Sequence, residues 1–284
     1  MAEGIRWKHG ARCAVTLSFD VDGESPWIYR DKALAERPLH MSMGAYGPKT
    51  GVPRILTLLD RYDIKAGFFI PGWIVERYPD MCQEIVRRGH EVGHHGYLHE
   101  KPFFLSGREE EEALLVKSLD IFKALLGIRP VGSRAPSADP SKDTMDLLKT
   151  HGFAYHSNMM DADLPYLHKT PHGELVELPT AWVNNDFPFF GFSAVPPVGN
   201  GIWSQQDVFE IWSEEFEGMY DEGGFFNLMG HPQVIGRPSR MRMLERLILQ
   251  ILGKKDIWFA KPIEVAEFWL AQGSIAHRSS RPDS

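Results

Sequence analysis

Short apolar runs alternate with longer amphipathic segments along almost the whole chain, and this alternation limits the fold more than any other feature. The apolar runs are rich in β-branched and aromatic residues, which is typical of buried strands. They cover residues 13–19, 66–70, 90–94, 130–133, 153–157, 175–178, 225–229 and 257–260. Helical spacing predicts helices near 52–62, 79–88, 109–126, 142–150, 205–222 and 240–252. Strands that alternate with helices imply a parallel sheet, and about seven or eight such units predict a closed or nearly closed barrel.

The chain length, 284 residues, suits one α/β domain. We expect this domain to cover residues 13–273, between a polar N-terminal segment at 1–12 and a flexible tail at 274–284. Residues 25–50 and 184–203 interrupt the alternation and are predicted to be irregular insertions. Insertions at the C-terminal ends of barrel strands usually shape the substrate site, and packing on the surface is the alternative.

Composition narrows the classes of partner. The formal net charge is −7 and the isoelectric point is near 5.9, and a nucleic acid or an anionic membrane would need a basic face. We therefore expect a small or uncharged substrate, with no nucleic-acid and no membrane partner. The N-terminus is polar, no apolar stretch is long enough to cross a bilayer, and the cysteines are Cys13 and Cys82. These features predict a cytoplasmic protein with two reduced thiols that pack as small hydrophobic groups.

Two carboxylates follow the first apolar run. Asp20 and Asp22 lie two positions apart, so their side chains project to the same face if the extended geometry continues. Two carboxylates side by side repel each other unless a cation or a shared proton relieves them. The pair therefore points to a divalent metal ion, and capping of the following turn is the alternative.

Residues 88–99 contain four histidines and offer two different metal sites. His90 to His94 matches the string H-E-x-x-H of zinc proteases, which functions only on a helix that brings both histidines to one face. Here Gly89 and Gly93 and the β-branched Val92 disfavour a helix. The protease string is therefore expected to be coincidental, with His90 and His94 in structural roles.

The second reading places a strand at residues 90–94 and the metal ligands on the turn after it. His95 and His99, together with Asp22, form a set of two histidines and one carboxylate that leaves positions for water and substrate. Such ligands suit Zn²⁺, Co²⁺, Mn²⁺ or Fe²⁺. We expect one divalent ion per chain, with zinc as the first choice.

These residues resemble the motifs of the polysaccharide deacetylases, carbohydrate esterase family 4. Residues 18–23 (SFDVDG) are similar to T-F-D-D-G, 67–72 (GFFIPG) to T-F-F-x-x-G, 95–99 (HGYLH) to H-[ST]-x-x-H, 133–136 (SRAP) to R-x-P, and 228–232 (LMGHP) to the last motif, which carries a histidine. The matches follow the family's order and span residues 14 to about 269. Each is short, but together they are specific.

The resemblance implies an α/β fold, a distorted (β/α) barrel of about seven parallel strands, with a metal ion in its mouth. It implies that Asp20 is the catalytic base, that Arg134 orients this base and that His231 is the acid that protonates the leaving nitrogen. Pro136 of the third motif is expected to contact substrate. Asp186, which lies in a Phe-rich stretch, is a candidate for the substrate pocket or for capping its own loop.

The resemblance favours a metal-dependent hydrolase of non-peptide carbon–nitrogen bonds that deacetylates polysaccharide or peptidoglycan. The extra residue in the first motif, and residues 175–186 in place of the usual D-x-x-D-W, resemble a divergent branch that includes intracellular peptidoglycan-deacetylase-like proteins, cyclic imide hydrolases and allantoinase-like ureide hydrolases. A small-molecule hydrolase on the same fold is therefore the alternative to a glycan deacetylase. A barrel that binds metal or sugar without turnover is the non-enzymatic alternative. The Phe-rich segment would also suit an interface in a homo-oligomer.

Overall fold

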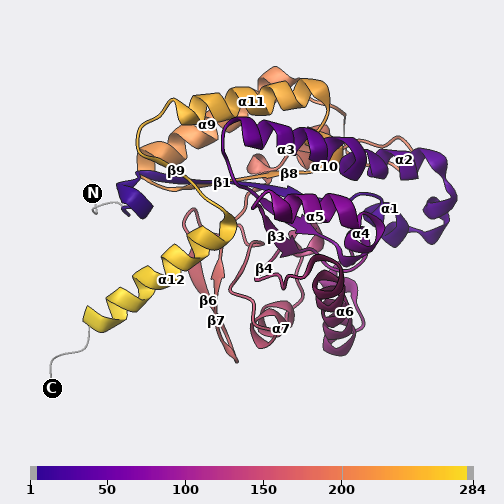
Figure 1. The fold of residues 1–284 in the computed structure, drawn as a ribbon, viewed down its shortest axis with the longest axis horizontal. Helices are drawn as coiled ribbons and strands as arrows, with labels where there is room; N and C mark the ends of the chain where they lie inside the picture. The colour runs from indigo at the N-terminus through magenta and orange to yellow at the C-terminus, as the bar shows by residue number, and fades with distance from the viewer. Residues whose placement is uncertain (1–4, 200, 280–284) are drawn as a thin grey trace.

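Strand β1 (Cys13–Asp20) lies inside the sheet, and all of its residues are buried. In the computed structural model, which describes residues 5–199 and 201–279, the sheet contains nine strands in the order β6-β7-β5-β4-β3-β2-β1-β8, with β9 also paired to β1 (Figure 1). The other strands are β2 (Gly67–Ile70), β3 (Glu91–His94), β4 (Gly132–Ser133), β5 (Tyr155–His156), β6 (Tyr166–Thr170), β7 (Gly173–Glu177), β8 (Phe225–Gly230) and β9 (Ile257–Phe259). A strand that is buried on both faces reads as a continuous apolar run, as β1 does.

Each strand predicted from the sequence has a counterpart in the sheet, whereas β6 was not predicted. Strand β6 pairs antiparallel with β7, and the other strand pairings among the described residues are parallel. The side chains of β6 are half-buried or exposed, so its sequence lacks the apolar run that marks the other strands.

The sheet forms a distorted barrel that does not close. Strands β6 and β8 are the end strands, and the segment that follows β7 reaches β8 through an isolated parallel bridge between Asn185 and Met229. The side-chain amide of Asn227 on β8 also donates a hydrogen bond to the carbonyl of Pro179, just after β7 (2.9 Å). The predicted α/β barrel of about seven parallel strands is therefore confirmed, with an incomplete ladder at this one junction.

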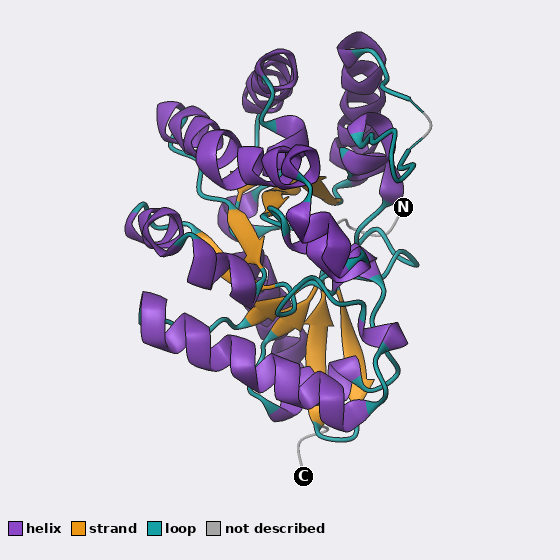
Figure 2. Ribbon diagram, turned by 90° about the vertical axis from the view of Figure 1, so that its right-hand side faces the viewer, coloured by secondary structure: helices purple, strands orange, loops and turns teal. Residues whose placement is uncertain are grey.

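Helices surround the strands, as Figure 2 shows. The predicted helices are α3 (Val52–Arg61), α5 (Pro79–Arg87), α6 (Arg108–Leu126), α7 (Thr144–Thr150), α9 (Gln205–Glu222) and α11 (Pro238–Leu252). Helix α9 begins after Ser204, whose side chain accepts a hydrogen bond from the Asp207 amide, and ends at Gly223 in the left-handed conformation (φ 75°). In α3, Ile55, Leu58 and Leu59 are buried on one face, which explains the helical spacing in the sequence.

Residues 25–50 were predicted to be irregular, and this was wrong. They form α1 (Ser25–Arg30), a 3₁₀ turn (Lys32–Glu36), α2 (Pro38–Tyr46) and most of a π-helical turn (Gly47–Gly51). Helices α1 and α2 and the π-helical turn each have a proline in the first turn, where a missing N–H costs little. The prolines and glycines that resembled loop residues are therefore helix starts and close packing contacts.

The described residues of the second insertion, 184–199 and 201–203, are mostly irregular, as predicted, apart from α8 (Phe187–Phe190) and the end of a 3₁₀ turn (Trp182–Asn184). They meet the first insertion directly, because the His40 imidazole Nε2 hydrogen-bonds with the carbonyl oxygen of Val195. The two insertions are therefore joined to each other.

The ends of the chain depart from the predicted boundaries. Trp7, in the segment expected to lie outside the domain, is buried, and its indole N–H donates to the Gly223 carbonyl (3.0 Å). Helix α12 (Pro262–Ser279) continues past residue 273, where a flexible tail was expected to follow, and it projects from the rest of the fold in Figure 1. Residues 1–4 and 280–284, parts of the two predicted terminal segments, lie outside the described residues. No helix in the described ranges has the length and apolar character needed to span a bilayer.

Candidate active site

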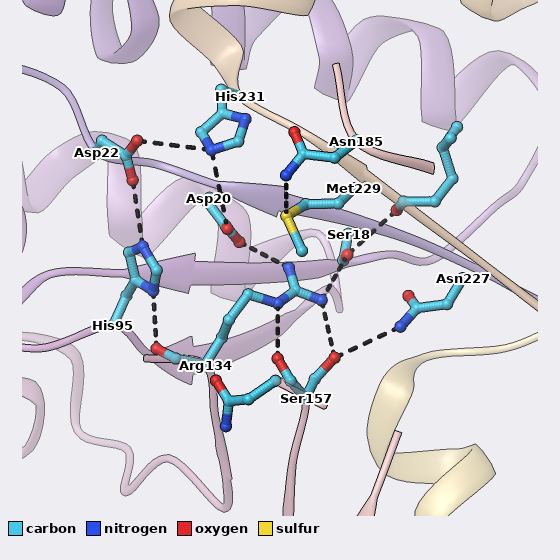
Figure 3. Close-up of polar contacts among 12 residues, drawn as sticks. Ser18, Asp20, Asp22, His95, Arg134, Ser157, Asn185, Asn227, Met229 and His231 are labelled. Atoms are coloured by element: carbon cyan, nitrogen blue, oxygen red, sulfur yellow. Dashed lines mark hydrogen bonds and ion pairs between the residues drawn. The ribbon is translucent and has the colours of Figure 1, made fainter. Parts of the chain in front are cut away.

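The predicted catalytic and metal-ligating residues come together at one edge of the sheet. Asp20 ends β1, His95 follows β3, Arg134 follows β4 and His231 follows β8 (Figure 3). The C-terminal ends of parallel strands meet at the same edge, so residues distant in the sequence become neighbours there. Asp22, two residues beyond the end of β1, lies beside them.

Asp22, His95 and His99 form a compact set of metal-ligating groups. One ligand atom from each residue lies within 4.8 Å of the others. The Asp22 carboxylate oxygen Oδ1 is 3.3 Å from His95 Nε2 and 3.7 Å from His99 Nε2. This oxygen is buried and accepts no hydrogen bond within the described part of the chain. An orphaned buried acceptor facing two imidazole nitrogens fits a divalent cation.

The orientation of His95 also fits metal binding. Its Nδ1–H donates to the backbone carbonyl of Arg134 (2.8 Å), and this leaves Nε2 to face Asp22. Metal-ligating histidines commonly donate their other ring N–H to a carbonyl or a carboxylate, which fixes the tautomer. Although burial acts to raise the pKa of Asp22, the neighbouring histidines hold this pKa below its ordinary value.

The turn that carries His99 is stabilised by Glu100, a residue that was not predicted from the sequence. The buried Glu100 carboxylate accepts hydrogen bonds from the Tyr97 N–H (2.7 Å) and the Leu98 N–H (2.5 Å). Gly96 has a left-handed backbone (φ 73°), and a side chain there would also press on Glu100 and Pro136. This conformation explains glycine where Ser or Thr is usual. The sequence feature that could have identified Glu100 is its position directly after His99.

The Arg134 guanidinium holds Asp20 in a buried frame of hydrogen bonds. Its Nη1 donates to Asp20 Oδ1 at 2.7 Å, and its Nη2 donates to the hydroxyls of Ser18 and Ser157, both at 3.1 Å. Only 1% of Arg134 is exposed, and its guanidinium stacks 4.2 Å from the ring centre of Phe69. Ser18 and Ser157 fix the arginine, and neither was predicted to have this role.

His231 lies across the site from His95 and is oriented by Asp186. The His231 N–H donates to Asp186 Oδ2 (2.9 Å), and its ring Nδ1–H donates to Asp186 Oδ1 (2.6 Å). The other ring nitrogen, Nε2, lies 4.0 Å from Asp20 Oδ2 and 3.8 Å from Asp22 Oδ2. Burial acts to lower the pKa of His231, but Asp186, together with Asp22 and Asp20, outweighs burial and raises this pKa to about 9.

The two residues expected to contact substrate are placed elsewhere. Asp186 is 0% exposed, and both of its oxygens bind His231 from behind, so it supports this histidine instead of lining a pocket. Pro136 is buried behind the Gly96 turn. The side chain that does extend beside His231 is Phe187, which is 38% exposed and packs edge-on against the imidazole at 5.3 Å.

The protease string does not form a site. His90 precedes β3 and His94 ends it, so the backbone between them is extended and not helical. Glu91 accepts hydrogen bonds from the Tyr155 hydroxyl (2.6 Å) and the Ile263 N–H (2.8 Å). Burial lowers the pKa of His90 to about 4 and that of His94 to about 3, so both rings are neutral packing groups.

Several known proteins are similar to this chain in sequence and in fold. The family profile described as polysaccharide deacetylase matches residues 45–156. A peptidoglycan deacetylase from Helicobacter pylori is 30% identical over 282 residues, which cover 90% of this chain and 96% of the relative. The crystal structure of a candidate polysaccharide deacetylase from Mycobacterium smegmatis is 38% identical with a TM-score of 0.92, covering 96% of this chain and 95% of that one.

The crystal structure of Puue allantoinase is also similar, with 25% identity and a TM-score of 0.82 over 95% of this chain and 94% of that one. The likeness thus extends over almost the whole length of each relative, and one relative whose name states deacetylation of peptidoglycan reaches 30% identity. The chain belongs to the polysaccharide deacetylase family.

Proposed function

We propose that the chain is a metal-dependent hydrolase of non-peptide amide bonds, which removes N-acetyl groups from the sugars of a polysaccharide or peptidoglycan. One observation carries this proposal. The metal-ligating set of Asp22, His95 and His99 lies between two buried ion pairs, Asp20–Arg134 and Asp186–His231. The arrangement provides separate groups to remove a proton and to donate one.

The ligand set supports one divalent ion, for which zinc is our first choice and cobalt, manganese or iron are alternatives. Asp22 and His99 would each offer one atom, and the Arg134 carbonyl fixes His95 to offer Nε2. When bound, such an ion would polarise the amide carbonyl and lower the pKa of a water molecule.

Asp20 is the proposed base. Its Oδ1 accepts a charge-assisted hydrogen bond from Arg134, which fixes the orientation of the carboxylate. Its Oδ2 faces His231 across the site and is available to take a proton from the attacking water. Arg134 contacts the base but no reacting atom in this scheme, so it acts as a positioning residue.

His231 is the proposed acid. Asp186 keeps its imidazole protonated and directs Nε2 toward the two aspartates. The water oxygen bonds to the carbonyl carbon, the carbon–nitrogen bond breaks, and the His231 proton moves to the departing nitrogen. The products are a carboxylic acid, which loses its proton to solvent on release, and a free amine; Asp20 has gained one proton from water and His231 has lost one to the nitrogen.

A second candidate function is hydrolysis of a compact cyclic imide or ureide. The contact between His40 and Val195 joins the two insertions, and Phe187 adds an apolar wall next to His231. Together they favour a restricted pocket over a groove for a polymer. The likeness to Puue allantoinase is consistent with this candidate, but the higher identity to a peptidoglycan deacetylase keeps the glycan in first place.

Hydrolysis of two substrate panels by the zinc-reconstituted full chain tests the proposal. N-acetylglucosamine oligomers and peptidoglycan are scored for acetate, and succinimide, hydantoin and allantoin are scored for ring opening. We expect acetate release that falls about 10²–10⁴-fold with Asp20→Asn, because the base is lost. Ring opening without acetate release would establish the second candidate instead. No turnover in either panel would contradict both.

A further inference from the structure

We propose that Gln233 is a positioning residue of the metal site, because its side chain fixes the orientation of the Asp22 carboxylate. The π-helical turn Gly47–Gly51 packs against Gln233 and holds it in place. This inference rests on the proposed metal dependence and adds a residue outside the family motifs described above. Gln233 lies in α10 (Pro232–Ile235), two residues after His231.

The contact between Gln233 and Asp22 assigns different roles to the two carboxylate oxygens. The Gln233 amide Nε2 donates to Asp22 Oδ2 at 3.1 Å. The other oxygen, Oδ1, faces His95 and His99 and accepts no hydrogen bond from the described residues. A hydrogen bond on one oxygen restrains rotation of the carboxylate, so the free oxygen stays directed at the ligand set.

A neutral donor suits this position better than a charged one. An arginine or lysine would form a salt bridge with Asp22 and compete with the metal ion for the same negative charge. The carboxamide restrains the carboxylate and leaves its charge available. The Gln233 Oε1 is itself buried without a hydrogen-bond partner among the described residues, so the side chain is held mainly through Nε2 and through packing.

The packing comes from the first insertion. A Cβ atom on Gly47 would lie 3.1 Å from the Gln233 backbone nitrogen and 3.2 Å from its Oε1. A Cβ atom on Gly51 would lie only 2.2 Å from the Pro232 carbonyl oxygen. Both glycines have ordinary right-handed backbone angles, so close approach explains glycine here and backbone conformation does not. The first insertion therefore packs directly against Gln233, the residue that restrains Asp22.

The test measures zinc affinity of the full-length chain by competition with a chromophoric chelator. Gln233→Met keeps the length of the side chain and removes the donor, so packing alone would be preserved. We expect about 10- to 100-fold weaker zinc binding, the range for residues that orient a ligand. Gly47→Ala should weaken binding in the same direction by a smaller factor, because the new methyl group displaces Gln233.

Gly218→Ala is the matched control, since this exposed glycine in α9 has no atom near its Cβ position. It should leave zinc affinity unchanged. Urea unfolding of each metal-free variant checks that the fold is intact. Equal zinc affinity of wild type and Gln233→Met would overturn the inference and leave the proposed function standing. A wild-type chain that binds no zinc would overturn both.

Discussion

Two histidine pairs lie next to each other in the chain and behave in opposite ways. His90 directly precedes β3 and His94 is its last residue, and both rings are buried in the packed fold. Burial lowers the pKa of His90 to about 4 and that of His94 to about 3. His95 and His99 lie on the turn directly after the strand and face the Asp22 carboxylate. The end of the strand at His94 therefore separates a packing pair from the pair that we propose as metal ligands.

The acidic residues beside the two histidine pairs, Glu91 and Asp22, also differ, because their pKa values shift in opposite directions. Burial raises the pKa of Glu91 to about 7, because its partners are neutral hydrogen-bond donors. Burial also acts on Asp22, but the surrounding histidines outweigh it and lower the pKa. Burial alone thus does not make a functional site; the charged partners at the C-terminal edge of the sheet do.

The largest expected difference is in metal binding. His95→Gln should abolish binding of one zinc ion and reduce hydrolysis below detection, because the ligand set loses a nitrogen and the open site needs all three groups. The adjacent substitution His94→Gln should retain full zinc content, as should His90→Gln. Metal analysis of the purified variants checks this. Zinc lost from the His90 and His94 variants but kept in His95→Gln would reverse our assignment of the two pairs.

The second prediction concerns the turn that sets the ligand pair apart. Glu100→Gln replaces one of two acceptor oxygens with a donor, so the Tyr97 and Leu98 amides can no longer both be satisfied. We expect zinc affinity to fall about 10- to 100-fold, measured by chelator competition. Glu76→Gln is the control, since Glu76 meets the same turn only through the exposed Tyr97 hydroxyl. Similar losses in both variants would argue against a specific role for Glu100.

The third prediction concerns the pH dependence of the packing pair. His94 has a folded pKa of about 3 against an ordinary value of 6.5, so the unfolded chain takes up a proton first as the pH falls below 6.5. The contribution of His94 to the free energy of unfolding is therefore fully present above pH 6.5 and declines below it, by up to about 1.4 kcal/mol per pH unit. Between pH 7 and pH 5, metal-free wild type should lose about 1–2 kcal/mol more than His94→Gln. Urea unfolding at both pH values should show this; parallel losses would mean that His94 is not neutral by burial.

The smallest expected effect is at Glu91 and has the opposite sign. Its folded pKa of about 7 exceeds the ordinary 4.5, so its contribution is most favourable below pH 4.5 and is lost as the pH rises to about 7. Glu91→Gln cannot ionise, and it should gain about 1 kcal/mol of stability relative to wild type at pH 6 compared with pH 5. Unfolding curves at the two pH values measure this gain. An equal effect of the substitution at both would show that folding does not raise the pKa of Glu91.

Much of this fold was predictable because its signals are local. The apolar run before Asp20 marks β1, and the glycines around His90 and His94 indicate that the protease string is not helical. His95 and His99 could then be placed on the turn after β3. The sequence did not indicate β6, because its residues form no apolar run. It did not indicate helices α1 and α2 of residues 25–50 either, because each has a proline in its first turn, which resembled a loop.

The unpredicted parts of the site depend on contacts between distant segments. Gln233 reaches Asp22 because β1 and β8 are paired, and Asp186 reaches His231 because the preceding residue, Asn185, bridges to Met229 on β8. No local pattern marks a glutamine or an aspartate in such a role. The placement of Asp186 behind the acid, instead of in the substrate pocket, is a tertiary result of the same kind.

Zinc titration into the chelator-stripped full chain, with acetate release from N-acetylglucosamine oligomers followed at each step, tests the central claim most directly. Our account predicts no release without metal, a linear rise with added zinc, and saturation at one equivalent per chain, with His94→Gln reproducing the curve and His95→Gln remaining flat. Acetate release that survives chelation, or that persists in His95→Gln, would contradict the account.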